Sequence, residues 1–319
     1  MQGIVRVPVL FVNAYLVDVE PDNPSGGWVL VDSGLPGLGA QAIARAAAVR
    51  YGARPPRAIV LTHGHFDHAG SAARLASTWR VPIFAHELEL PYLTGRSGYP
   101  PPDPTVGGAF AMMSRTFPHG GIDLGALVRP IDIHGLHGLH GYSDGGVSPL
   151  LPGWRVLHTP GHTAGHLSLF RESDGTLLAG DALATMNQES WLSAVTLERE
   201  LRWPPAPWTT DWTAANASVH RLAALRPRAI AAGHGLPMTR DNTTEAMQTF
   251  ASHFAPPRSG RYMRRPARAD QRGVVSLPPP VADPVGGAIR GGAITAAATG
   301  IMLTISLARR RGRRRAALG

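Results

Sequence analysis

Histidine and aspartate are concentrated in the segment THGHFDHAG, residues 62–70. The chain has no cysteine, so a metal ion bound here would have to be held by imidazole nitrogen and carboxylate oxygen, donors that zinc, iron and manganese accept. His63 and His65 are alternate residues, which can point to one side of an extended turn. Asp67 and His68 can reach another side. This one loop could therefore serve two metal ions.

Later segments also place histidine or aspartate where a predicted strand ends. These residues are His162 in TPGHTAGH, Asp181 in LLAGDA and His234 in AAGHGLP. A histidine-rich loop can be solvated surface or ordinary packing, and for a single histidine that explanation would suffice. It does not explain why several separate segments carry the same donor types. The sequence therefore predicts a metal centre assembled from several strand ends.

The elements that must position these residues are alternating strands and helices. The run MQGIVRVPVLFVNAYLVDVE is predicted as a strand, and PDNPSGG supplies a turn before WVLVDSG, so residues 4–34 are expected to form a hairpin. Helices are predicted at 40–50, 71–80 and 213–225. Further strands are predicted at AIVLT, VPIFAH, WRVLHTP, TLLAGDA and AIAAGHG. This alternation excludes an all-α or all-β fold and favours an α/β (α+β) fold.

Residues 91–150 break the pattern, because they are rich in proline, glycine and histidine and contain few long apolar runs. We expect an insertion over the site. Within it, His134, His137 and His140 are spaced three apart, which would suit a second metal site, a pocket wall or loop histidines without a metal. The intervening glycines argue against a rigid ligand-bearing helix. Candidates for a pocket wall, or for packing beneath neighbouring loops, are Tyr92, Tyr99, Tyr142, Met186 and Trp191.

The whole pattern resembles the metallo-β-lactamase-fold hydrolase superfamily over about residues 4–250. The HxHxDH loop of that family is matched by His63, His65, Asp67 and His68, and its later ligands by His162, Asp181 and His234. The resemblance implies an αββα sandwich with a dinuclear metal site at its edge. It also implies that His63, His65 and His162 hold one metal and Asp67, His68 and His234 the other, with Asp181 as the bridge. Two divalent ions per chain are expected, zinc first, with iron or manganese as alternatives.

The resemblance also assigns roles around the metals. Asp32 in VLVDSG matches a family aspartate that supports the metal ligands without binding metal itself. An aspartate in a strand-end turn with no such role would fit the sequence equally well. His166 is not a ligand in the pattern and is expected to be structural. In the implied chemistry, a hydroxide held between two metals attacks an acyl carbon, and Asp67 passes a proton to the leaving group. The residues expected to take part in catalysis are Asp67, Asp181 and Asp32.

The bond to be cleaved would belong to a small-molecule lactone, thioester or related ester, with lactams and phosphodiesters also open. PGHTAGH resembles glyoxalase II, but DALATMNQESW stands where that family has a stretch with glycine and cysteine, and the chain beyond residue 250 does not resemble its glutathione-binding domain. The segments HTPGHTAGHLSLF and LLAGDA are closer to lactonase-like members. The alternative is an iron-dependent, persulfide dioxygenase-type oxidoreductase, because ligand identity does not select the metal. A binding protein without catalysis would leave the ligand set unexplained.

The last part of the chain differs in composition from the rest. Residues 255–319 contain 13 arginines and two aspartates, whereas the rest of the chain is slightly acidic. No nucleic-acid surface is therefore expected on the catalytic domain, which is predicted at 1–254. An uncharged run at 291–308 precedes RRRGRRR, so residues 291–315 are a candidate for membrane association in an otherwise cytoplasmic protein. A terminal helix packed on the body and a flexible basic tail are the alternatives.

Overall fold

The computed structural model describes residues 1–21, 23, 26–117, 120–131, 150–190, 198–283 and 285–286. The chain divides into two compact units, Met1–Pro279 and Pro280–Gly319. The sheets and helices that position the predicted site belong to the first unit.

A first sheet is built from the N-terminal part of the chain. In spatial order its strands are β1 (Ile4–Val9), β2 (Val12–Asp18), β3 (Trp28–Val31), β4 (Ile59–Val60), β5 (Ile83–Ala85) and β6 (Val128–Pro130). The pairings from β1 to β3 are antiparallel, and those from β3 to β6 are parallel. The carboxyl ends of the parallel strands therefore meet at one edge of the sheet.

A second sheet comes from later in the chain. In spatial order its strands are β10 (Ala229–Ala232), β9 (Thr176–Gly180), β8 (Leu167–Arg171) and β7 (Trp154–His158). β7, β8 and β9 pair antiparallel, whereas β9 and β10 pair parallel. A short hairpin follows, formed by β11 (Arg268–Asp270) and β12 (Gly273–Ser276).

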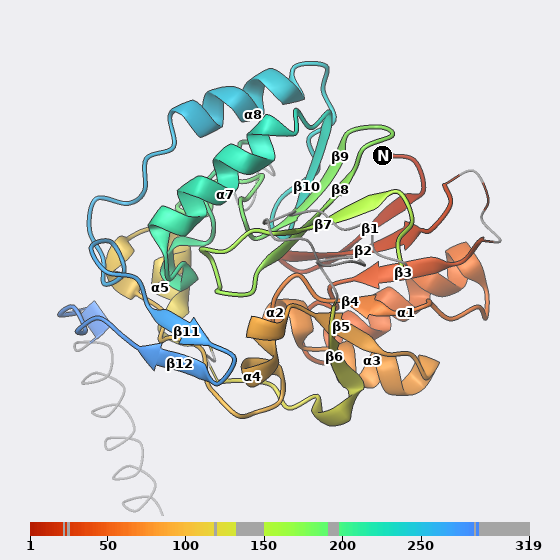
Figure 1. Cartoon of the computed structure of the whole chain (residues 1–319), viewed down its shortest axis with the longest axis horizontal. Helices are drawn as coiled ribbons and strands as arrows, with labels where there is room; N and C mark the ends of the chain where they lie inside the picture. The colour runs from red at the N-terminus through yellow and green to blue at the C-terminus, as the bar shows by residue number, and fades with distance from the viewer. Residues whose placement is uncertain are drawn as a thin grey trace, which may run out of the picture. The chain divides into compact units, whose positions relative to one another are not determined.

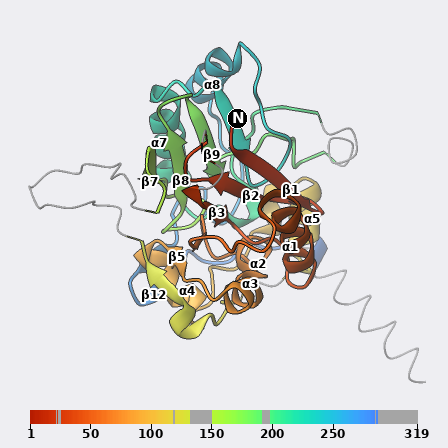
Figure 2. The ribbon, with the colours of Figure 1, turned by 90° about the vertical axis from the view of Figure 1, so that its right-hand side faces the viewer.

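Helices cover the outer faces of both sheets. The α-helices are α1 (Leu38–Tyr51), α2 (Phe66–Ala69), α3 (Ala72–Trp79), α4 (Leu90–Leu93), α5 (Ala109–Ser114), α7 (Trp212–Ala224) and α8 (Thr243–Ser252). The 3-10 helices are η2 (Glu87–Glu89), η3 (Pro104–Val106), η4 (Gly125–Leu127) and η5 (Ala206–Trp208). Figure 1 shows α1 and α3 beside the first sheet and α7 and α8 beside the second, and Figure 2 gives the view at a right angle. The predicted αββα sandwich is confirmed.

Alternating side chains explain why both faces of each sheet are covered. In β2, Leu16 packs in the cluster that contains α1 and α3 residues, while its neighbours Tyr15 and Val17 pack in the cluster between the sheets. In β9, Leu178 packs between the sheets and Leu177 packs with the cluster that contains α7 and α8 residues. Because strand side chains alternate with a period of two, one strand contributes to two apolar layers. These layers hold the sandwich together.

The N-terminal run forms two strands rather than the single strand predicted. Leu10 has a φ of 58°, a left-handed conformation that leucine rarely adopts. The chain reverses there, so that Val9 pairs with Val12. No glycine or asparagine marks this turn, and those are the residues from which a tight hairpin is usually recognised. The missed turn matters because it carries Phe11 to the edge of the site.

Residues 255–279 pack within the first unit, although the catalytic domain was predicted to end at residue 254. Tyr262 is buried, and its hydroxyl donates a hydrogen bond to the carbonyl oxygen of Pro101 at 2.6 Å. The β11–β12 hairpin belongs to the same stretch. We propose that the catalytic domain extends to about Pro279.

The predicted insertion at 91–150 is described in part. It contains α5 and also β6, which joins the first sheet beside β5. Outside the described residues lie His134, His137, His140, Tyr142, Trp191 and the whole of 291–315. No helix in the described part of the chain is long and apolar enough to cross a membrane.

Candidate metal centre

The predicted ligands follow the carboxyl ends of strands from both sheets. His63 and His65 lie in the loop after β4, Asp181 directly follows β9, and His234 lies just beyond β10. The remaining donors are in α2, Asp67 and His68, and in the loop between β7 and β8, His162. Because β9 and β10 are parallel neighbours, their carboxyl ends deliver Asp181 and His234 to the same edge.

All seven predicted ligands converge into groups whose donor atoms lie within 4.8 Å of one another. The first group is His63, His65 and His162, and the second group is Asp67, His68 and His234. A third group, His63, His68 and Asp181, takes one residue from each of these two and adds the aspartate. In the first group, Nδ1 of His65 is 3.0 Å from Nε2 of His162. In the second group, Oδ2 of Asp67 is 3.8 Å from Nε2 of His68 and 3.6 Å from Nε2 of His234. Donors about 2.1 Å from a tetrahedral ion stand roughly 3.4 Å apart, so these spacings suit metal ligation.

Asp181 stands between the two groups. Its Oδ2 atom is 4.0 Å from Nε2 of His63 and 3.5 Å from Nε2 of His162, which belong to the first group. The same oxygen is 3.3 Å from Nε2 of His68 and 3.2 Å from Nε2 of His234, which belong to the second. One carboxylate oxygen therefore lies near both groups, where a bridging ligand would have to be.

Several buried atoms of the centre have no hydrogen-bond partner among the described residues. They are Nε2 of His63, Nε2 of His68 and Oδ1 of Asp181. A buried polar atom left without a partner costs about 1–3 kcal/mol, so gathering three of them at one point is unfavourable unless something else satisfies them. Nitrogen and oxygen donors that converge without cysteine are those that zinc, iron and manganese bind. These residues therefore fit two divalent metal ions.

Burial and charge set the protonation of the histidines. Burial, reinforced by neighbouring imidazoles, lowers the pKa of His63, His65 and His162, and that of His65 falls to about 3. These rings are held neutral, which is the form that binds metal. Burial acts in the same direction on His68 and His234, but nearby carboxylates, chiefly that of Asp181, outweigh it and raise the pKa of both. A metal ion at the second group must therefore displace protons.

Polar contacts hold the ring nitrogens, Nδ1 of His68 and of His234, that do not face the other donors. Oδ2 of Asp32 lies 2.8 Å from Nδ1 of His68, and the same carboxylate accepts hydrogen bonds from the backbone N–H and hydroxyl of Thr62 at 2.8 and 2.9 Å. The carbonyl oxygen of Phe11 lies 2.8 Å from Nδ1 of His234. These contacts fix the ring orientations and leave Nε2 for the metal. Because Asp32 acts through His68, we propose that it is a positioning residue and not a catalytic one.

His166 has a supporting place rather than a ligand place. Its Nε2 accepts a hydrogen bond from the backbone N–H of Asp181 at 2.8 Å, and its Nδ1 lies 2.8 Å from the hydroxyl of Thr159. Burial lowers the pKa of His166 to about 3, so a neutral ring is available to accept at Nε2. The side chain thereby fixes the backbone at the point where Asp181 leaves β9.

Glu89, which sequence reasoning missed, connects the two loops that carry the first group. Its buried side chain accepts hydrogen bonds through Oε1 from the hydroxyl of Thr163 at 2.7 Å and from the N–H of Gly165 at 2.9 Å. Through Oε2 it accepts from the N–H of Gly64 at 3.0 Å and from the hydroxyl of Tyr99. Gly64 lies between two ligands of the first group and Thr163 directly follows the third. One carboxylate therefore braces both loops.

Gly233 leaves the space in which the second group meets Asp181. A Cβ added at Gly233 would stand 2.0 Å from Oδ1 of Asp181 and 2.6 Å from Cε1 of His68. Real Cβ atoms do not approach other heavy atoms so closely. The glycine is therefore required by the close approach of the ligands.

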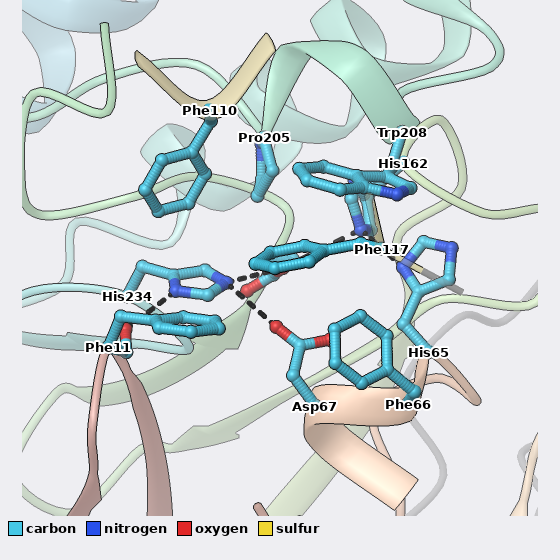
Figure 3. A pocket seen from close by; sticks show the side chains of 11 residues that line it. Phe11, His65, Phe66, Asp67, Phe110, Phe117, His162, Pro205, Trp208 and His234 are labelled. Atoms are coloured by element: carbon cyan, nitrogen blue, oxygen red, sulfur yellow. Dashed lines mark hydrogen bonds and ion pairs between the residues drawn. The ribbon is translucent and has the colours of Figure 1, made fainter. Parts of the chain in front are cut away.

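A pocket with aromatic walls opens over the donors. Figure 3 shows the rings of Phe11, Phe66, Phe110, Phe117 and Trp208 around the candidate ligands. The other lining residues are His65, Asp67, His162, Asp181, Pro205 and His234. None of the five aromatic residues was predicted from the sequence, although the place of Phe66 inside the HxHxDH loop was a usable signal.

The residues that the sequence suggested as pocket lining lie outside this pocket, as far as the structure describes them. Tyr92, Tyr99 and Met186 are buried and do not line the described pocket. Tyr92 stacks on Tyr99 with ring centroids 4.1 Å apart, and Tyr99 donates its hydroxyl hydrogen to Glu89. The tyrosines therefore pack beneath the ligand loops, which was the second of the two expectations.

Comparison with known proteins agrees with this geometry. A family model described as the metallo-beta-lactamase superfamily matches residues 7–234. The chain is 37% identical over 256 residues to the probable metallo-hydrolase YflN of Bacillus subtilis (strain 168). The aligned region covers 80% of this chain and 92% of that protein. It is 31% identical over 126 residues to a hydroxyacylglutathione hydrolase of Halorhodospira halophila (strain DSM 244 / SL1), covering 40% of this chain and 32% of that protein.

A solved structure gives the same result. The metallo-beta-lactamase family protein TTHA1429 from Thermus thermophilus aligns with a TM-score of 0.50 and 26% identity, over 79% of each chain. The chain therefore belongs to the metallo-beta-lactamase superfamily.

Proposed function

We propose that the protein is a metal-dependent hydrolase that cleaves an acyl bond of a small molecule at a dinuclear metal centre. The observation that carries the proposal is the place of Oδ2 of Asp181, within 4.0 Å of histidine nitrogens from both donor groups. Membership of a superfamily that includes probable metallo-hydrolases supports it. The proposed substrates are lactones, thioesters and related esters.

The two donor groups would each hold one ion, with Asp181 shared between them. Divalent ions held by these residues would lower the pKa of a bound water and polarise the oxygen of the bond to be cleaved. We propose zinc for both positions, because zinc accepts imidazole and carboxylate donors and supports hydrolysis without redox chemistry. Iron and manganese accept the same donors.

Asp67 is the residue best placed to move a proton. It lines the pocket, and its side chain is 13% exposed, against 2% for that of Asp181. A carboxylate that faces the pocket can take up and release a proton during turnover. We propose that Asp67 carries the proton to the leaving group. Nε2 of His234, 3.6 Å from Oδ2 of Asp67, faces the same carboxylate.

Replacing the shared carboxylate tests the proposal. Asp181→Ala should lower kcat/KM on a panel of esters, thioesters and lactones by about 100-fold or more, the upper part of the range seen when metal-site support is removed. Asp270→Ala is the matched control, because Asp270 forms an exposed ion pair with Arg272 and should keep full activity. Circular dichroism would establish that both variants are folded.

Hydrolysis that persists in folded Asp181→Ala would refute the shared-carboxylate centre. Bound iron, oxygen consumption and no hydrolysis by the natural sequence would refute the hydrolase proposal in favour of the dioxygenase alternative.

A further inference from the structure

We propose that the substrate carries an uncharged, apolar group beside the bond that is cleaved, as in an alkyl ester or a lactone with a hydrocarbon chain. The inference rests on the proposed function for the type of reaction. The observations that support it concern the aromatic residues of the pocket walls, which are different residues from the proposed metal ligands.

The walls are five aromatic rings that form one connected surface. The rings come from the β1–β2 turn (Phe11), α2 (Phe66), α5 (Phe110), the segment after α5 (Phe117) and η5 (Trp208). Phe117 stacks on Phe11 with centroids 5.8 Å apart and on Trp208 at 5.9 Å. It meets Phe66 edge-on at 5.3 Å. Figure 3 shows these rings around the mouth of the site.

The aromatic surface reaches the donors themselves. Phe11 stacks on His234 with centroids 6.1 Å apart, and Phe110 meets the same imidazole edge-on at 5.6 Å. Phe11, Phe66 and Phe117 are only half-buried, so they retain apolar surface that an entering molecule can cover. A substrate whose scissile bond lies at the donors must place the neighbouring atoms against these rings. Covering apolar ring surface with apolar substrate atoms is favourable.

Among the described residues, the pocket walls offer no arginine or lysine to a charged substrate. The chain contains no lysine, and in the part that the structure describes no arginine lines this pocket. By sequence, the internal segments outside the description, 22, 24–25, 118–119, 132–149 and 191–197, contain no arginine. Proteins recognise carboxylates chiefly through arginine and lysine. A carboxylate beside the scissile bond would face aromatic rings.

Hydroxamic acids test the walls directly, because their head group binds metal whether or not turnover occurs. Calorimetric titration of the zinc-loaded full chain would compare butano-, hexano- and octanohydroxamic acid with suberic monohydroxamic acid, which has the length of the octano compound but ends in a carboxylate. We expect affinity to rise about two- to fourfold per methylene, since each buried methylene contributes up to about fourfold. The carboxylate compound should bind at least about tenfold more weakly than its octano counterpart, because its charge has no partner.

A charge placed in the wall should reverse the preference. Phe117→Arg puts a guanidinium at a half-buried position of the surface and should tighten binding of the carboxylate compound about tenfold while weakening that of octanohydroxamic acid. Val49→Arg is the matched control, because it adds the same charge at a position 91% exposed on α1. It should leave both affinities unchanged.

Affinity that is independent of chain length, or a carboxylate compound that binds the natural sequence as tightly as its octano counterpart, would overturn the inference. Failure of the proposed function would look different. A protein that ranks the probes by chain length and charge but hydrolyses no ester, thioester or lactone would refute hydrolysis and leave the apolar pocket standing.

Discussion

Glu89→Gln removes the charge of the carboxylate that hydrogen-bonds to both loops of the first donor group, with almost no change in side-chain volume. The carboxylate receives two backbone N–H groups, from Gly64 and Gly165, and two hydroxyl groups, from Tyr99 and Thr163. A hydroxyl can rotate to accept from a new amide, but a backbone N–H can only donate. If the amide nitrogen replaces Oε1, the N–H of Gly165 faces another donor. If it replaces Oε2, Gly64 can still use the Tyr99 oxygen, 2.9 Å away, but the Tyr99 hydroxyl hydrogen loses its acceptor.

One buried donor is therefore left unsatisfied in either orientation, which costs about 1–3 kcal/mol. The remaining hydrogen bonds also lose the charge of the carboxylate, and a charged bond contributes about 1 kcal/mol more than a neutral one. Because Glu89 is fully buried, solvent does not weaken these interactions. We expect Glu89→Gln to lower the free energy of unfolding by about 3 kcal/mol. We also expect weaker metal binding by about tenfold, since the ligands of one group depend on the brace.

Equilibrium unfolding in urea, followed by circular dichroism with and without added zinc, would measure the change. Competition with a chromophoric chelator would measure metal affinity. Glu172→Gln is the control, because that side chain is 65% exposed and pairs with Arg155 at 3.1 Å, a surface pair that contributes less than about 1 kcal/mol. The reasoning would be refuted if Glu89→Gln matched the natural sequence in both stability and metal affinity, or if Glu172→Gln were equally damaging.

Three more predictions follow from the same contacts. Gly233→Ala should lose metal from the centre, because its Cβ would stand 2.0 Å from Oδ1 of Asp181. Gly120→Ala should bind metal normally, because no atom of the described residues lies within 4 Å of a Cβ added there. Elemental analysis of both variants would test the difference. Deleting 280–319 should leave a folded, active protein. Deleting 255–319 should lower the midpoint of thermal unfolding, because it removes the buried Tyr262 and the β11–β12 hairpin. Equal midpoints for the two truncated proteins would place the domain boundary at residue 254. On acidification, metal should leave the second group at a higher pH than it leaves the first. The pKa of His68 and that of His234 are raised, so protons compete with metal at the second group, whereas the pKa of His65 in the first group is about 3. The pH at which His63→Ala releases its remaining ion should therefore lie above that for His234→Ala, and the reverse order would contradict the assignment.

Most of the ligand set could be predicted from the sequence because these donors lie within a few residues of a strand end. His63 and His65 follow one apolar strand, and Asp181 and His234 each follow another. Parallel strands bring their carboxyl ends together whatever the loops do. The residue types and the strand pattern therefore indicated which segments would carry the donors, whereas the division of the donors into two groups came from the resemblance to the superfamily.

The supporting contacts could not be predicted, because they join segments that no local pattern connects. Glu89 reaches Gly64 across 25 positions and Thr163 across 74. The aromatic wall is assembled from five elements, and Phe11 enters it only because Leu10 turns the chain through a left-handed conformation. Such contacts depend on tertiary packing, which overrides local propensity.

Counting metal ions per chain tests the central claim most directly. The full-length protein, reconstituted with zinc and freed of excess, would be analysed by mass spectrometry for moles of each element per mole of chain. The proposed division of the seven donors into two groups that share Asp181 predicts two ions per chain, and one ion in His63→Ala. One ion or none in the natural sequence after reconstitution would contradict a dinuclear centre.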